Sequence, residues 1–134
     1  MDTLSQSFRR SANGGLYAGT HILSDLYGVA CPDTVEAVEA LLRGAAAAAG
    51  AQALDFSFNK FDTGGGITAM LQLAESHITL HSWPEYRFVA VDVFMCGAAD
   101  TAAAARHIKD ALKSKFSYDW AHTRGELWDY VIAN

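Results

Sequence analysis

Apolar and polar residues alternate with a period of two through much of the chain between residues 54 and 94. Every second residue is apolar in 54–58, in 67–73 and in 89–93. Because successive side chains of a β-strand point to opposite faces, this period predicts strands with one face in a core. Three of the four residues that alternate with the valines of 89–93 are also apolar, namely Phe88, Ala90 and Phe94 but not Asp92. This predicts a central strand covered by helices or a partner. Further strands are expected near 17–27 and 127–133.

Two other segments have a helical period. After Pro32-Asp33 the apolar residues of 33–49 fall on one stripe, and the segment stops at Gly50, a residue that readily ends a helix. A second helix is expected after Gly97, with Asp100 or Thr101 as its cap. Two helices among five or six strands predict an α+β fold, a two-layer sandwich in which a mostly antiparallel sheet is covered on one face by two helices.

Composition excludes several classes of protein. The 134 residues, 51% of them hydrophobic, suffice for a single domain, 1–134. Fifteen acidic against ten basic residues give a net charge of −5, so nucleic-acid binding is not expected. The longest purely apolar run, 45–49, is too short for a membrane span, and no secretory signal begins the chain, which predicts a cytoplasmic protein.

The most informative segment, 75–86, reads Glu-Ser-His-Ile-Thr-Leu-His-Ser-Trp-Pro-Glu-Tyr. Strand alternation places His77, Thr79 and His81 on one face and Ile78 in the core. Two histidines so spaced suit a metal, but a third ligand would be needed. The available ones, Glu75, Asp92 and Cys96, do not stand at a recognised ligand spacing, so we expect no metal site.

Ser76 suggests a different chemistry. It lacks the flanking glycines of a hydrolase nucleophile elbow. At a strained Glu75-Ser76 peptide, however, its oxygen can attack the preceding carbonyl to give an ester, which eliminates to dehydroalanine and hydrolyses to a pyruvoyl group. The reaction needs oxyanion donors and a base, and His81 and the Thr68 hydroxyl are candidates. The resulting ketone can form a Schiff base with a substrate amine and accept electrons when CO2 leaves.

Segment 75–86, followed by Ala-Val-Asp-Val-Phe-Met-Cys-Gly at 90–97, resembles the signature of the short, class 1 prokaryotic S-adenosylmethionine decarboxylases. These are pyruvoyl-dependent enzymes of polyamine (spermidine) biosynthesis, and the resemblance extends more loosely from Thr20 to Gly125. It implies cleavage between Glu75 and Ser76 into a β chain, 1–75, and an α chain, 76–134. The cofactor would be a covalent pyruvoyl group derived from Ser76, without pyridoxal phosphate. The family also implies a homodimer with active sites at its interface.

The resemblance also implies roles for single residues. It makes His81 an aid to self-processing and Cys96 the proton donor to the substrate carbon after decarboxylation. Thr68 stands where the family usually has a processing serine. The substrate contacts that it implies are Phe61, Ile78, Trp83 and Glu85. An aromatic platform suits adenine and a carboxylate suits ribose hydroxyls, which favours a nucleoside substrate.

Departures from the family pattern keep two alternatives open. The segment 62–70 differs from the usual sequence beside the expected pocket and contributes an extra acid, Asp62. A carboxylate there would suit the distal cation of ornithine or arginine, so a decarboxylase of either amino acid is one alternative. The other is an unprocessed, non-catalytic regulatory partner, in which Ser76 is an ordinary strand serine.

Overall fold

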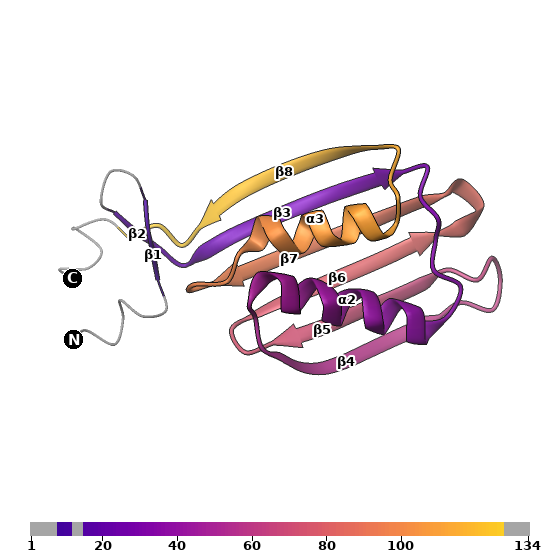
Figure 1. The fold of residues 1–134 in the computed structure, drawn as a ribbon, viewed down its shortest axis with the longest axis horizontal. Helices are drawn as coiled ribbons and strands as arrows, with labels where there is room; N and C mark the ends of the chain where they lie inside the picture. Colours follow the sequence, from indigo (N-terminus) through magenta and orange to yellow (C-terminus); the bar gives the residue numbers. More distant parts are fainter. Residues whose placement is uncertain (1–7, 12–14, 128–134) are drawn as a thin grey trace.

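The computed structural model describes residues 8–11 and 15–127 (Figure 1). In chain order the elements are β1 (Arg9–Arg10), β2 (Leu16–Tyr17), β3 (Gly19–Tyr27), α2 (Val35–Ala49), β4 (Ala53–Lys60), β5 (Ile67–Leu73), β6 (Ser76–Trp83), a 3-10 turn (Pro84–Tyr86), β7 (Phe88–Cys96), α3 (Thr101–Ala111) and β8 (Phe116–Arg124). The main sheet has the strand order β4-β5-β6-β7-β3-β8, and every neighbouring pair is antiparallel. A short hairpin of β1 and β2 lies beyond one end of this sheet.

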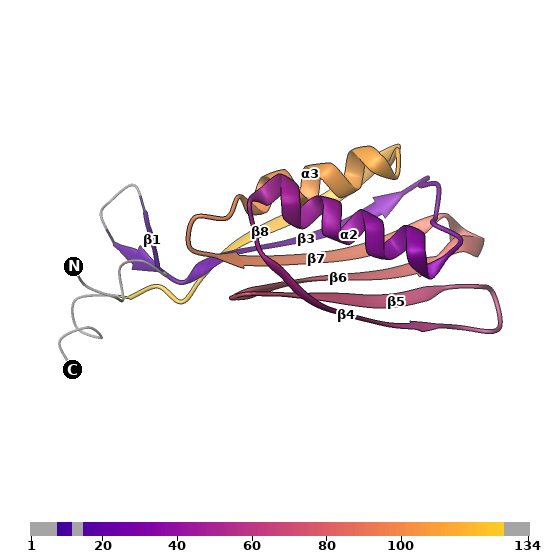
Figure 2. The same ribbon diagram turned by 60° about the horizontal axis from the view of Figure 1, so that its bottom comes forward.

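Both helices lie on the same face of the sheet (Figure 2). The predicted α+β sandwich, with one face of a mostly antiparallel sheet covered by two helices, is therefore confirmed. Among the described residues, no helix is long and apolar enough to cross a membrane.

The helix boundaries follow from their caps. The Thr34 side chain accepts a hydrogen bond from the Ala37 N–H, and Gly50 ends α2 with φ of 74°. The helix thus begins two residues later than predicted, because Thr34 is still extended. Asp100 caps α3 by accepting from the Ala103 N–H, which confirms one of the two predicted caps.

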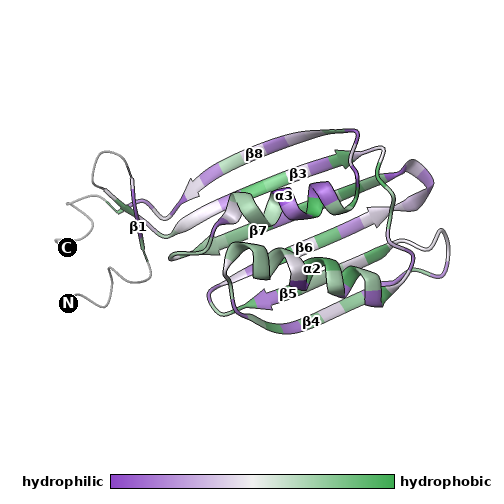
Figure 3. Ribbon diagram, viewed as in Figure 1, coloured by the Kyte–Doolittle hydropathy of each residue, from purple (hydrophilic) through white to green (hydrophobic). Residues whose placement is uncertain are grey.

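The core lies between the helices and the covered face of the sheet. On α2, Val38, Leu42 and the alanines at 45 and 46 are fully buried. On the central strand β7, the buried residues alternate as predicted, with valines at 89, 91 and 93 facing the helices. Figure 3 shows the same alternation as bands of different hydropathy along the strands. Burial of this face supplies the main hydrophobic stabilisation of the fold.

The sequence did not predict the edge strand β8, Phe116–Arg124. It pairs with β3 along its whole length, from Tyr27 opposite Phe116 to Gly19 opposite Arg124. Its apolar residues are aromatic and exposed, so they do not mark a core face. The strand predicted near 127–133 falls almost wholly outside the described residues.

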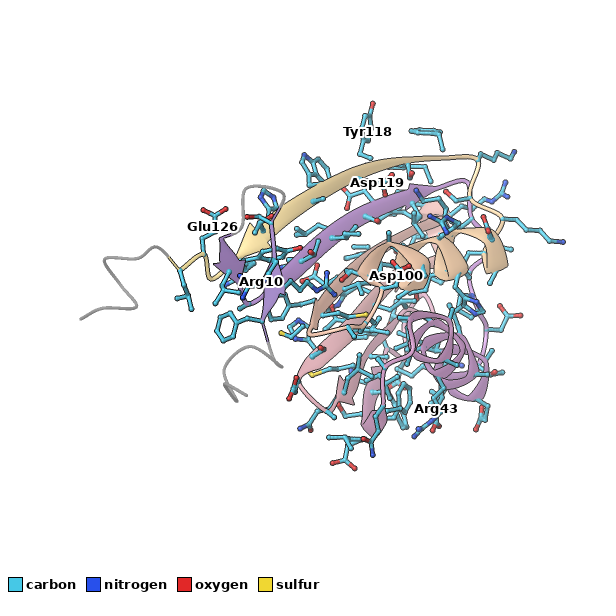
Figure 4. The ribbon with its side chains drawn as sticks, turned by 60° about the vertical axis from the view of Figure 1, so that its left-hand side comes forward. Arg10, Arg43, Asp100, Tyr118, Asp119 and Glu126 are labelled. Carbon is cyan, nitrogen blue, oxygen red and sulfur yellow. The ribbon has the colours of Figure 1, made fainter. Side chains whose placement is uncertain are left out.

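The face of the sheet opposite the helices carries many exposed aromatic side chains. The strand register places Trp83, Phe88, Tyr27 and Phe116 in one row across four strands. Tyr118 stands away from β8, and its side chain is 58% exposed (Figure 4). A row of aromatic side chains that the described residues leave uncovered is typical of a surface that binds a partner.

Candidate active site

One end of the sheet brings Ser76 and Cys96 together. Ser76 begins β6 directly after the tight turn formed by Ala74 and Glu75, and Cys96 ends the neighbouring strand β7. The backbone N–H of Cys96 donates a hydrogen bond to Ser76 Oγ at 3.2 Å. A pocket of about 210 Å³ is lined by Glu75, Ser76 and Cys96, together with the end of α2 and the loop after β7. The predicted cleavage bond and the predicted proton donor therefore share one small pocket.

The environment of Cys96 keeps its thiol protonated. Burial raises the pKa of this thiol above its usual value, and the negative charge of Glu75 raises it further. The hydrogen bond with Ser76 and the charge of Arg9 act in the opposite direction but are weaker. At neutral pH the group is thus a thiol and not a thiolate, which is the form that can give a proton to carbon.

Arg9 holds the loop that follows Cys96. Its Nε donates to the Gly97 carbonyl at 2.9 Å, and one of its terminal nitrogens donates to the Ala99 carbonyl. Its other terminal nitrogen donates to Thr20 Oγ1 at 2.9 Å. Sequence reasoning missed Arg9, because these partners are up to 90 positions away in the chain and no local pattern relates them.

A second group of predicted residues gathers at the other end of β6. Thr68 Oγ1 lies 3.1 Å from Nδ1 of His81, its partner across β5 and β6. Both residues line a pocket of about 400 Å³ whose walls also include Phe61, Trp83 and Glu85. Five of the predicted site residues, from three different segments, are therefore brought together in one pocket.

The turn between β4 and β5 shapes this pocket. Gly64 and Gly65 have φ of 82° and 72°, a region that favours glycine. A side chain at Gly66 would stand 2.7 Å from the Ser82 carbonyl, so the close approach of the two strands requires glycine there. The Ser82 hydroxyl accepts from the Ile67 N–H at 2.9 Å and fixes the same two strands. The pocket wall is thus held by backbone geometry.

Two predicted substrate contacts lie elsewhere. Ile78 is fully buried in the core that faces the helices, so its side chain is not available to a substrate. The alternation of β6 dictates this position, and the inference from family resemblance did not take it into account. Asp62 lies in the exposed turn before β5 and is absent from the residues that line the larger pocket.

The two pockets are separated along the sheet. His81 follows Ser76 by five positions on the same strand. At about 3.3 Å per residue, the two residues lie about 16 Å apart. Within one chain, the pair Thr68 and His81 therefore does not reach the Glu75-Ser76 bond.

The chain is similar to a known protein family and to a solved structure. The S-adenosylmethionine decarboxylase family matches residues 20–125. A curated relative from Sulfurihydrogenibium sp. (strain YO3AOP1), an S-adenosylmethionine decarboxylase proenzyme, is 44% identical over 100 residues, which cover 72% of this chain and 74% of the relative. A proenzyme of the same description from Thermosipho africanus is 36% identical and covers 81% and 85%. The crystal structure of the adenosylmethionine decarboxylase from Aquifex aeolicus VF5 superposes with a TM-score of 0.75 at 35% identity and covers 83% of this chain and 93% of that one.

Proposed function

Because the chain belongs to the S-adenosylmethionine decarboxylase family, we propose that it releases CO2 from S-adenosylmethionine and uses a pyruvoyl group made from its own Ser76. The observation that carries this proposal is the pairing of Ser76 with Cys96 in one pocket. It supplies the serine for self-processing and a protonated thiol for returning a proton to the substrate.

The position of Ser76 suits self-cleavage into fragments 1–75 and 76–134. The bond to be cut follows a tight, exposed turn, while the serine oxygen is held by the Cys96 N–H. After cleavage each fragment remains in the sheet, because β5 ends before the cut and β6 begins after it. The name proenzyme, which the relatives carry, agrees with such a step. When formed, the pyruvoyl group supplies a ketone that withdraws electrons from the carbon losing CO2.

A complete site requires two copies of the chain. The processing pair Thr68 and His81 lies about 16 Å from Ser76 within one chain. Two sheets that stack through their uncovered aromatic faces, around a two-fold axis perpendicular to the strands, would place the Ser76 end of one copy against the His81 end of the other. The exposed row that includes Trp83 and Phe116 would be buried in this dimer. We therefore propose a homodimer with two identical active sites, each shared between the copies.

The larger pocket suits the nucleoside part of the substrate. Its volume of about 400 Å³ falls in the range of small-molecule sites. Phe61 and Trp83, which are 52% and 40% exposed, offer aromatic surfaces for an adenine ring. The Glu85 carboxylate can accept hydrogen bonds from ribose hydroxyls. Ornithine and arginine could bring a distal cation to Glu85, but they lack the adenine ring and the ribose hydroxyls and would use only part of these contacts.

The substrate prediction is tested by CO2 release from carboxyl-labelled compounds. We expect turnover of S-adenosylmethionine and none above background with ornithine or arginine, because Asp62 does not line the pocket. Trp83→Ala should raise KM by at least about tenfold through the loss of one stacking surface. Asp62→Asn serves as the matched control and should leave the kinetic constants unchanged. Preferred turnover of ornithine or arginine, lost in Asp62→Asn, would overturn the assignment.

Replacing Cys96 with alanine should separate processing from turnover. The variant is expected to cleave itself, because Ser76 and the residues proposed to assist it remain, but to lose about 100-fold or more in kcat. Intact mass and CO2 release measure the two properties. Since burial raises the thiol pKa, alkylation of Cys96 in the wild type should be slow at neutral pH and should accelerate only as pH rises past the usual cysteine range. Undiminished turnover in Cys96→Ala would contradict the role.

A further inference from the structure

Three side chains that line neither of these two pockets converge on the uncovered face of the sheet. They are His21 on β3, His77 on β6 and Asp92 on the strand between them, β7. His21 Nε2 lies 3.2 Å from Asp92 Oδ2, and one ligand atom from each residue lies within 4.8 Å of the others. From this geometry we propose that His21, His77 and Asp92 form a binding site for a divalent transition metal ion of the zinc type.

The donor set fits such an ion. Two imidazoles and one carboxylate are common protein ligands of Zn²⁺, Co²⁺ and Fe²⁺, and such sites keep further positions open for water or another ligand. The sequence pattern pointed to His77 and Asp92 but paired His77 with His81. In the structure the second histidine of the cluster is instead His21, which β7 separates from His77 in the sheet.

Burial favours binding to neutral imidazole. The His21 side chain is 15% exposed, and the ring of Phe94 packs against both histidines, with centroids 5.6 Å and 5.9 Å away. Burial, followed by the neighbouring His21, lowers the pKa of His77, so its ring keeps a lone pair for a metal at neutral pH.

Arg124 is the group that opposes a metal here. Its guanidinium lies 5.4 Å from the Phe94 ring centroid, and a terminal nitrogen is 3.4 Å from His21 Nδ1. A metal on Nε2 requires Nδ1 to carry the proton, so Arg124 must turn away when the ion binds. The contact is long and Arg124 is exposed, which permits this movement. Removing its charge should therefore tighten metal binding.

The site would join the two fragments of the processed protein. His21 belongs to residues 1–75, whereas His77 and Asp92 belong to residues 76–134. This consequence rests on the proposed cleavage, but the metal site itself does not. A bound ion would also fix His77, the residue next to Ser76, to β3 across β7. Because the metal site does not require cleavage, metal binding and processing can be measured independently.

The test is a titration of purified, tag-free, chelator-treated protein with Co²⁺, followed by visible absorption, with Zn²⁺ as competitor. We expect saturation at one Co²⁺ per chain. His77→Ala and the milder Asp92→Asn should each weaken binding by about 100-fold or more, since even outer-shell changes cost 10–100-fold. Arg124→Gln should tighten it. His122→Ala is the matched control, because His122 pairs with His21 on the same face but lies outside the cluster.

Three results would overturn the proposal. They are the absence of saturable Co²⁺ absorption in the wild type, equal weakening by His122→Ala, and unchanged binding in both ligand variants. Circular dichroism shows whether each variant is folded. If His77→Ala does not fold, Asp92→Asn still tests the proposal. Intact mass on the same samples reports cleavage at residue 76, so failure of the metal site and failure of the proposed function are distinguishable.

Discussion

Ser76→Ala is expected to remain a single uncut chain without decarboxylase activity. The alanine has no oxygen to attack the Glu75 carbonyl, so neither the ester nor the pyruvoyl group can form. The fold should survive, because the Ser76 hydroxyl bonds only Cys96 among the described residues, and each hydrogen bond contributes about 1 kcal/mol. Intact mass under denaturing conditions and CO2 release from labelled S-adenosylmethionine measure the two effects.

The matched control for this variant is Ser117→Ala. It removes a serine hydroxyl on the edge strand β8, which bonds Asp119 at 2.8 Å. This variant should cleave itself and turn over substrate like the wild type. The masses of the wild type should show two fragments, one that ends at Glu75 and one that begins at residue 76. An active but uncut Ser76→Ala protein would exclude the pyruvoyl mechanism. A wild type that remains one unmodified chain would instead favour the non-catalytic partner weighed at the outset.

Two inactive variants are expected to restore each other's function when they share a dimer. In a mixed dimer of Ser76→Ala and His81→Ala, one active site combines an intact Ser76 from one copy with an intact His81 from the other. The second active site has neither. Random pairing makes half of the dimers mixed, so about a quarter of the wild-type cleavage should return after co-expression. Each variant alone should show almost none.

The control mixture is Ser76→Ala with Cys96→Ala. These residues share the same end of the sheet, so no active site in a mixed dimer has both intact. Decarboxylation should therefore not rise above that of Cys96→Ala alone. Native mass spectrometry verifies that mixed dimers form. If mixed dimers form but no cleavage returns, Ser76 and His81 do not act across the dimer. That result would contradict the shared active site, which rests on their separation of about 16 Å within one chain.

Much of the architecture could be predicted from the sequence because its determinants are local. The period of two in 67–73 and 89–93 and the cap at Asp100 define strands and a helix from residues close together in the chain. The strand β8 escaped prediction because its aromatic side chains face away from the core, and hydrophobic periodicity identifies only faces that are buried.

The sequence by itself determined the kind of chemistry, because the motif around Ser76 is contiguous. Only the tertiary structure decided which residues meet. Pairing of β6 with β7 places Cys96 on Ser76, whereas the length of β6 keeps His81 away from it. The same packing brings Arg9 to the loop after Cys96 and adds His21 to His77 and Asp92. These relations depend on strand register and on the face of the sheet to which each residue points, and no local pattern in the chain records them.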